Sequence, residues 1–291
     1  MRNEAGQLLE SVRETIDVGR ATGVRVRISH LKAMGRDNWG KVTAALALID
    51  EARGEGIDVR ADQYPYTRGS TILEQLLSGG ALSGTGPYGA MSAEDLVVAG
   101  AGPRVEWVGK TVAELATLWR TDTIDACTRM VAEVGRDCII IQNTLSEDDL
   151  RTVMGHSDVL IGSDGVPLGE RPHPRLHHTF PRVLGEYVRT QGTLSLSDAV
   201  HRLTGLSARH FGLKGRGVVT AGSSADIVVF DPATIADTGT YEDPTSAPRG
   251  VTHVLVNGRF VVRSASPTSE RPGEVIRRGR ASNSRGRPSR Q

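Results

Sequence analysis

Residues 24–61 read VRVRISHLKAMGRDNWGKVTAALALIDEARGEGIDVRA, and their pattern indicates a strand, a helix and a second strand. Apolar and polar side chains alternate over 24–29, which is typical of a strand. Over 42–49 apolar side chains share one face at helical spacing, and glycines follow before the apolar segment 57–61. Elements joined in this order predict a βαβ unit and therefore a parallel sheet.

The same alternation continues along the chain. An apolar helical face at 9–16 precedes the first strand, so the chain opens on a helix that has no strand before it. Apolar strands are predicted at 138–142 and 158–162, and further helices at 111–118, 125–134, 146–155, 181–190 and 197–204. Because a (β/α)8 barrel needs eight strands, the four βα units in residues 1–212 predict an α/β fold that amounts to half a barrel.

Residues 67–103 are the least regular part of this region and are rich in Gly, Ser and Ala. A connection of this length inside a compact domain is often functional. Two interpretations stay open at this point: an active-site lid, or a loosely ordered surface loop.

After residue 212 the pattern changes to short β segments, predicted at 217–222, 225–230 and 251–262. Residues 213–263 are therefore expected to form a small all-β module. Residues 264–291 consist largely of Arg, Ser, Pro and Gly, a composition that predicts a basic, disordered tail. Because no aromatic side chain is interleaved with these arginines, binding to nucleic acid is not expected.

The composition limits the class of protein. The chain has 291 residues, of which 38% are hydrophobic and 24% charged, and its net charge of +1 is ordinary for a globular protein. It has no apolar run of the roughly 18 residues that a membrane-spanning helix needs, and its polar first residues do not resemble a signal peptide. Cys127 and Cys138 lack metal-type spacing and are expected to be buried. We expect a cytoplasmic protein without membrane partners.

Polar side chains follow the ends of the predicted strands. His30 and Lys32 follow the first strand, Tyr64 and Ser70 the second, and Asp164 the fourth. Functional groups of parallel βα folds gather at these ends. The combination suits hydrolysis, because a carboxylate such as Asp164 can deprotonate a metal-bound water and an imidazole is a common zinc ligand. Tyr64 or Lys32 could stabilise developing negative charge. Each residue taken singly is also compatible with a structural role.

Two neighbouring residues have competing interpretations. Asp62 could be a second catalytic carboxylate, but its place just inside a strand end favours the anchoring of a turn. Tyr66 is expected to pack in the core.

The stretch 171–178 reads RPHPRLHH. His173 and His177 are four residues apart, which on a helix is a zinc-like spacing. The prolines on either side of His173 argue against a helix there. We therefore expect a loop over the mouth of the site, with Arg175 available to an acidic group of a substrate, or else an ordinary surface loop.

Several motifs, taken in order along the chain, resemble those of the D-aminoacylase (N-acyl-D-amino-acid deacylase) family of metal-dependent amidohydrolases. The resemblance extends from residue 1 to about residue 279 and rests on Ile28–Lys32, Asp62–Tyr66, Gly69–Thr71, Trp107–Thr111, Gly162–Gly165, His173–Arg175, Thr179–Gly185 and Arg216–Pro232. It implies a distorted (β/α)8 barrel with a small β-sandwich domain. Residues 1–212 would be the C-terminal half of that barrel and 213–263 part of the sandwich. It also implies that zinc activates water to hydrolyse the amide bond of N-acyl-D-amino acids.

The resemblance assigns roles to individual residues. His30 resembles a zinc ligand, and Asp164 resembles the catalytic acid/base, which is also a carboxylate of the metal site. Tyr64 resembles the residue that orients the scissile group. The residues that resemble substrate-binding ones, chiefly for the substrate carboxylate and the pocket wall, are Lys32, Ser70 and Met34.

The chain also departs from the family pattern. A His-x-His zinc pair and a metal-bridging Cys belong to a part of the barrel that this chain lacks, and a further ligand His would directly precede Met1. His30 and Asp164 alone are fewer than the three protein ligands of a catalytic zinc site. His177 and His178 replace an aromatic residue and a glycine. Two interpretations follow: a piece of a longer enzyme, or a non-catalytic protein whose half-barrel is completed by another copy or a partner.

By ancestry we therefore expect a zinc-dependent deacylase of N-acyl-D-amino acids that is inactive as this chain alone. One alternative is another amidohydrolase that acts on cyclic amides, such as a dihydropyrimidinase. The other is a metal-free binding module. The segments Ile28–Lys32 and Asp62–Tyr66 favour the deacylase over the cyclic-amide hydrolase.

Overall fold

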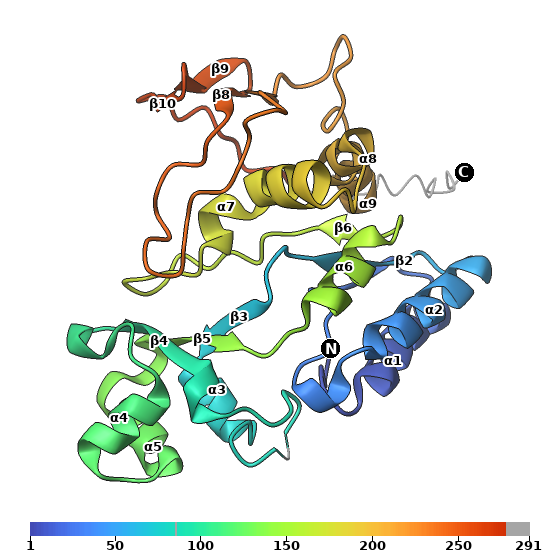
Figure 1. Cartoon of the computed structure of the whole chain (residues 1–291). Helices are drawn as coiled ribbons and strands as arrows, with labels where there is room; N and C mark the ends of the chain where they lie inside the picture. Colours follow the sequence, from blue (N-terminus) through green and yellow to red (C-terminus); the bar gives the residue numbers. More distant parts are fainter. Residues whose placement is uncertain (85, 278–291) are drawn as a thin grey trace, which may run out of the picture.

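A parallel sheet lies at the centre of the computed structural model, which describes residues 1–84 and 86–277 (Figure 1). Its strands are β1 (Val26–Ile28), β2 (Val59–Gln63) and β6 (Leu160–Ile161), in the order β1-β2-β6. Both pairings are parallel. The βαβ unit predicted from the sequence is thus confirmed, because β1 and β2 are neighbours joined by the helix between them.

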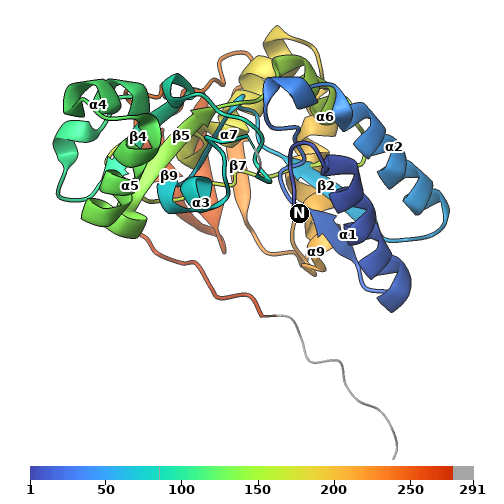
Figure 2. The same ribbon diagram turned by 90° about the horizontal axis from the view of Figure 1, so that it is seen from below.

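Three helices accompany this sheet: α1 (Leu8–Thr22), α2 (Lys41–Gly54) and α6 (Glu147–Gly155). α1 and α2 lie side by side against β1 and β2 (Figure 2). Their apolar faces form one buried cluster with the strands, which includes Leu8, Val12, Val42, Ile49 and Val59. The helical periodicity read from the sequence therefore marks the faces that pack.

A second, antiparallel sheet corrects the predicted topology. It contains β3 (Arg68–Ile72), β5 (Cys138–Asn143) and β4 (Leu96–Ala101), in the order β3-β5-β4. The prediction that 138–142 continues the parallel sheet is wrong, since β5 runs antiparallel to both neighbours. An apolar run indicates burial on both faces but carries no information about the direction of the partner strands. Here the partners come from the weakly patterned segment 67–103.

Helices cover this second sheet at the end of the molecule opposite α1 and α2 (Figures 1 and 2). They are α3 (Leu73–Ser78), α4 (Val112–Trp119) and α5 (Thr123–Val134). α4 begins with a complete capping box formed by Thr111 and Glu114. Both cysteines are buried, as predicted. Short 3-10 turns lie in the connections of the two sheets: η1 (Arg36–Asn38), η2 (Ala93–Asp95), η3 (Val105–Trp107) and η4 (Gly135–Asp137).

A run of helices leads from the parallel sheet to the C-terminal module: α7 (Arg175–Arg182), the π-helix η5 (Val183–Thr190), α8 (Leu196–His201), the π-helix η6 (Arg202–Leu206) and α9 (Ser207–Phe211). The predicted helices at 181–190 and 197–204 are confirmed. The prediction of a loop over 171–178 is wrong from Arg175 onward. Pro174 occupies the N-cap position, where a missing N–H costs nothing, so the prolines precede the helix without interrupting it.

The C-terminal module is a four-stranded antiparallel sheet in the order β10-β9-β8-β7. Its strands are β7 (Ile227–Phe230), β8 (Val251–Val256), β9 (Arg259–Arg263) and β10 (Ser266–Pro267). Asn257 and Gly258 both have positive φ, at 48° and 78°, and form the tight turn between β8 and β9.

Two predictions about this module are wrong: the strand at 217–222 and the boundary at residue 263. Residues 217–222 form no strand. The sheet extends to Pro267, beyond the predicted boundary at 263, while residues 278–291 of the predicted tail lie outside the described residues. Over residues 1–84 and 86–277, the helices are too short or too polar to span a membrane.

Candidate functional site

One open cavity of about 300 Å³ is lined by all seven residues that the sequence assigned to catalysis, substrate binding or metal binding. It lies where β2, β3, β6 and the start of α7 meet. The predicted residues that line it are His30, Lys32, Met34, Tyr64, Ser70, Asp164 and Arg175. They come from segments up to 145 positions apart, so the fold brings them together.

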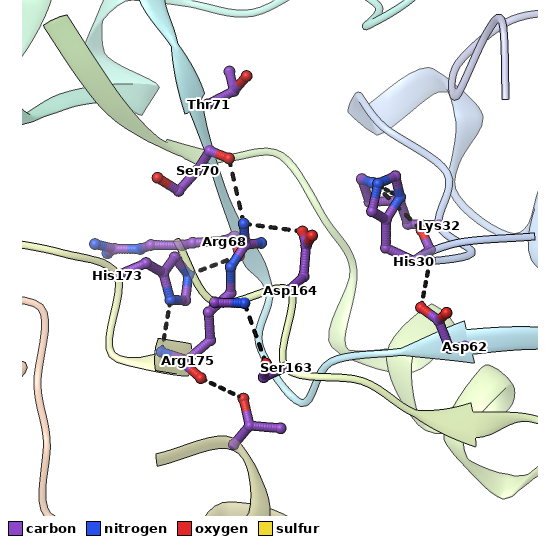
Figure 3. Close-up of polar contacts among 12 residues, drawn as sticks. His30, Lys32, Asp62, Arg68, Ser70, Thr71, Ser163, Asp164, His173 and Arg175 are labelled. Carbon is purple, nitrogen blue, oxygen red and sulfur yellow. Dashed lines mark hydrogen bonds and ion pairs between the residues drawn. The ribbon is translucent and has the colours of Figure 1, made fainter. Parts of the chain in front are cut away.

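The main chain at His30 is held in the left-handed region by a buried carboxylate. The φ angle of His30 is 42°, which is strained for a residue with a side chain. Its N–H donates to Asp62 Oδ1 at 2.7 Å (Figure 3). Asp62 Oδ2 in turn lies 3.1 Å from Arg27 Nε. Asp62 therefore anchors the turn after β1, as the sequence favoured.

A buried ionic cluster forms one wall of the cavity. Lys32 Nζ lies 2.8 Å from Glu4 Oε2 and 2.7 Å from His30 Nδ1. Glu4 Oε1 lies 3.2 Å from the same imidazole nitrogen. The main chain of Glu4 is fixed as well, because its N–H donates to Pro87 and its carbonyl accepts from Met34.

The charges in this cluster stabilise one another. Burial by itself raises the pKa of Glu4, but the ammonium of Lys32 and the neighbouring imidazole of His30 lower it to about 2. Burial by itself lowers the pKa of Lys32, but Tyr64 and Glu4 outweigh it and leave this pKa raised. Both groups are therefore charged at neutral pH.

The opposite wall is built around Arg175, whose side chain is 2% exposed. Its Nη2 lies 2.9 Å from Asp164 Oδ2 and donates to the Ser70 carbonyl at 3.3 Å (Figure 3). The guanidinium also stacks on the ring of Tyr64, 4.6 Å from its centroid. Asp164, like His30, has a positive φ, of 49°. Strained backbone at two predicted functional residues is typical of an active site.

His173 is not free to bind a metal ion. His173 is 3% exposed, and both ring nitrogens are engaged: Nε2 with the Arg68 carbonyl at 2.9 Å and Nδ1 with the Arg175 N–H at 3.0 Å. His177 lies on the exposed side of α7, whereas His178 is fully buried. The helical zinc pair considered for His173 and His177 is therefore wrong, because His173 precedes the helix.

The side chains of residues 1–84 and 86–277 do not form a complete zinc site. Over the described residues, no group of three His, Cys, Asp or Glu side chains is placed to hold a metal ion. His30 Nδ1 faces the ammonium of Lys32, and Asp164 faces the guanidinium of Arg175. Two protein ligands are fewer than the three of a catalytic zinc site.

The sequence assigned no role to Glu4 and Gln142, two further residues that line the cavity. Only its ion pairs across 26 and 28 positions bring Glu4 to His30 and Lys32. Gln142, at the end of β5, also lines the cavity, and its Oε1 accepts no hydrogen bond from the part of the chain that the structure describes. Its position at a strand end was the one signal available.

The α/β core gathers His, Lys, Tyr and Asp side chains from strand ends around one cavity, as the resemblance to amidohydrolases led us to expect. The sequence profile of the amidohydrolase family matches residues 110–262, more than half of the chain, and the chain belongs to this family. Within it, the chain is similar to deacylases of N-acyl-D-amino acids.

Three of these relatives define the similarity. The N-acyl-D-glutamate deacylase of Alcaligenes xylosoxydans xylosoxydans is 41% identical over 96% of this chain and 53% of its own length. The D-aminoacylase of the same organism is 39% identical over 96% of this chain and 54% of its own length. The crystal structure of N-acyl-D-glutamate deacylase from Bordetella bronchiseptica, complexed with zinc and a phosphonate inhibitor, gives a TM-score of 0.86 at 39% identity. The match covers 96% of this chain and 55% of that one. The chain thus spans about half the length of these relatives.

Proposed function

We propose that the cavity is the substrate-binding half of an active site that hydrolyses the amide bond of N-acyl-D-amino acids. The observation that carries this proposal is the convergence of the seven predicted site residues on one cavity with two buried cations, Lys32 and Arg175. Two buried cations beside a hydroxyl and a phenol suit a ligand that carries a carboxylate. The 41% identity to an N-acyl-D-glutamate deacylase favours this function over hydrolysis of cyclic amides.

We assign each residue of the cavity a role in this reaction from its position. Lys32, Ser70 and Arg175 bind the substrate carboxylate or an acidic side chain, and Met34 lines the pocket. Tyr64 lies between the two cations, with Arg175 4.6 Å and Lys32 6.0 Å from its ring centroid, where it orients the scissile group. When an incoming carboxylate pairs with Arg175, Asp164 loses its partner and becomes available as the acid/base.

We further propose that this chain is inactive alone. His30 and Asp164 supply two of the metal ligands, and the others come from a polypeptide equivalent to the remaining half of the relatives. That polypeptide would pair with the free edges of β1 and β6, so that these strands become part of a (β/α)8 barrel. The sheet β7–β10 would likewise become part of a small β-sandwich.

Two measurements on the purified chain test these proposals. Isothermal titration with N-acetyl-D-glutamate and N-acetyl-D-methionine should show binding that is weaker for the L-enantiomers and weakened about tenfold or more by Lys32→Met, because a charge-assisted contact is lost. Zinc content and release of the free D-amino acid should both be negligible, as in an Asp164→Ala control.

Each outcome decides a separate point. Equal binding of both enantiomers, or none, would reject the substrate-binding role and favour a different binding module. Stoichiometric zinc with turnover that Asp164→Ala abolishes would reject the claim that the chain is inactive alone.

A further inference from the structure

We propose that His173 is a positioning residue: it holds the main chain at the start of α7 and so fixes the guanidinium of Arg175 in the cavity. The proposal rests on the proposed function only for the choice of ligand in one of its two assays.

Two hydrogen bonds define the chemical state of His173. The Arg68 carbonyl can only accept, so Nε2, at 2.9 Å, must carry the proton. The Arg175 N–H can only donate, so Nδ1, at 3.0 Å, must be unprotonated. The neutral Nε2–H tautomer alone satisfies both partners, and no lone pair is left for a metal.

Aromatic rings seal this imidazole from water. Tyr66 and Tyr241 both contact it edge to face, with centroids 5.1 and 5.2 Å away. The guanidinium of Arg68 in turn covers the ring of Tyr241, 4.3 Å from its centroid. Burial, with Arg175 adding to it, lowers the pKa of His173 to about 3, so the imidazole is neutral at pH 7.

The hydrogen bond from the Arg175 N–H to His173 Nδ1 lies at the start of α7. Arg175 is the first residue of α7, and its N–H is one of the donors that a helix leaves without a partner. Pro174, at the N-cap, offers no side-chain acceptor. His173 Nδ1 takes that role, so it fixes the first turn from which the Arg175 side chain projects.

The same two residues attach α7 to an edge strand. β3 is at one edge of its sheet, and His173 and Arg175 donate to its carbonyls at Arg68 and Ser70, two residues apart. The guanidinium then reaches Asp164 from this fixed base (Figure 3). His173 does not itself line the cavity, so it is coupled to the cavity through Arg175, which does.

Two substitutions each keep one of the two hydrogen bonds of the imidazole and remove the other. In His173→Asn the amide oxygen can take the place of Nδ1 and accept from Arg175, but the side chain is too short for Arg68. In His173→Gln the amide nitrogen can reach the Arg68 carbonyl, but nothing accepts from Arg175. His173→Phe removes both bonds, and His177→Asn, on the exposed neighbour, is the matched control.

The first assay needs no ligand: hydrogen exchange of the Arg175 amide, followed by NMR or mass spectrometry. We expect His173→Gln and His173→Phe to exchange at least about fivefold faster than wild type, and His173→Asn and His177→Asn to stay within about twofold, as the loss or retention of one hydrogen bond requires. Far-UV circular dichroism checks that all variants are folded.

The second assay is the affinity for N-acetyl-D-glutamate, which should fall in the same order. Faster exchange with unchanged affinity would reject the link to the cavity. Wild-type exchange in His173→Gln, or exchange in His173→Asn as fast as in His173→Phe, would overturn the proposal itself. If wild type binds no N-acetyl-D-glutamate, the proposed function fails, but the exchange rates still decide whether His173 positions the start of α7.

Discussion

The buried ion pair between Glu4 and Lys32 makes a quantitative prediction about stability. The pKa of Glu4 falls from its ordinary value of 4.5 to about 2 on folding. Because each tenfold change in proton affinity is worth about 1.4 kcal/mol, this fall corresponds to about 3 kcal/mol of folding free energy. Glu4→Gln removes the charge but keeps the shape, and it leaves Lys32 buried without an anion. We therefore expect a loss of about 3 kcal/mol at pH 7.

The pH dependence follows from the direction of the shift. Since the pKa of Glu4 is lower in the folded state, its contribution is complete above about pH 5.5 and is lost as the pH falls from about 4.5 towards 2. Urea unfolding of wild type and Glu4→Gln between pH 8 and pH 4 measures the difference. The difference in free energy of unfolding between the two proteins should be constant down to about pH 5.5 and should become smaller below it.

Two controls test the physical cause. Glu4→Gln combined with Lys32→Met leaves no unpaired charge, so it should recover most of the lost stability. Glu14→Gln breaks the exposed pair with Arg2 and should leave the unfolding midpoint unchanged. A loss below about 1 kcal/mol for Glu4→Gln, or a gap that widens on acidification, would refute the reasoning.

Further predictions concern other parts of the site and fold. Asp164→Asn leaves the guanidinium of Arg175 buried without a counter-ion and should cost about 2 kcal/mol in chemical unfolding. Asp62→Ala removes the acceptor for the His30 N–H, so hydrogen exchange of that amide should accelerate about tenfold. Gly258→Ala places a side chain at φ 78° in the β8–β9 turn and should lower stability by about 1 kcal/mol, read as a lower Tm.

The sequence predicted the parts of the fold in which local pattern and packing agree. β1, α2 and β2 were recognisable because their apolar faces have the period of the element that buries them. β5 was found as a strand, but its antiparallel pairing depends on β3 and β4, whose Gly- and Ser-containing sequences give a weak pattern. The strand expected at 217–222 is apolar but has no partner strand among the described residues.

The candidate site was predicted to a similar extent. His30, Tyr64 and Asp164 follow strand ends, where functional groups of parallel βα folds gather. All three line the cavity. Glu4 and the bridging role of His173 could not be predicted, because each depends on hydrogen bonds between segments distant in the chain. Such bonds leave no periodic trace in the sequence.

The left-handed backbone at His30 sets stability against the proposed function at this position. Glycine would relax its φ angle at little steric cost, so variants selected only for resistance to heat should accumulate glycine at 30. At 164 the same change would also break the ion pair with the buried Arg175, so glycine should not accumulate there. Laboratory evolution of this chain for robustness would therefore remove the imidazole of His30, unless each round of selection also demanded ligand binding.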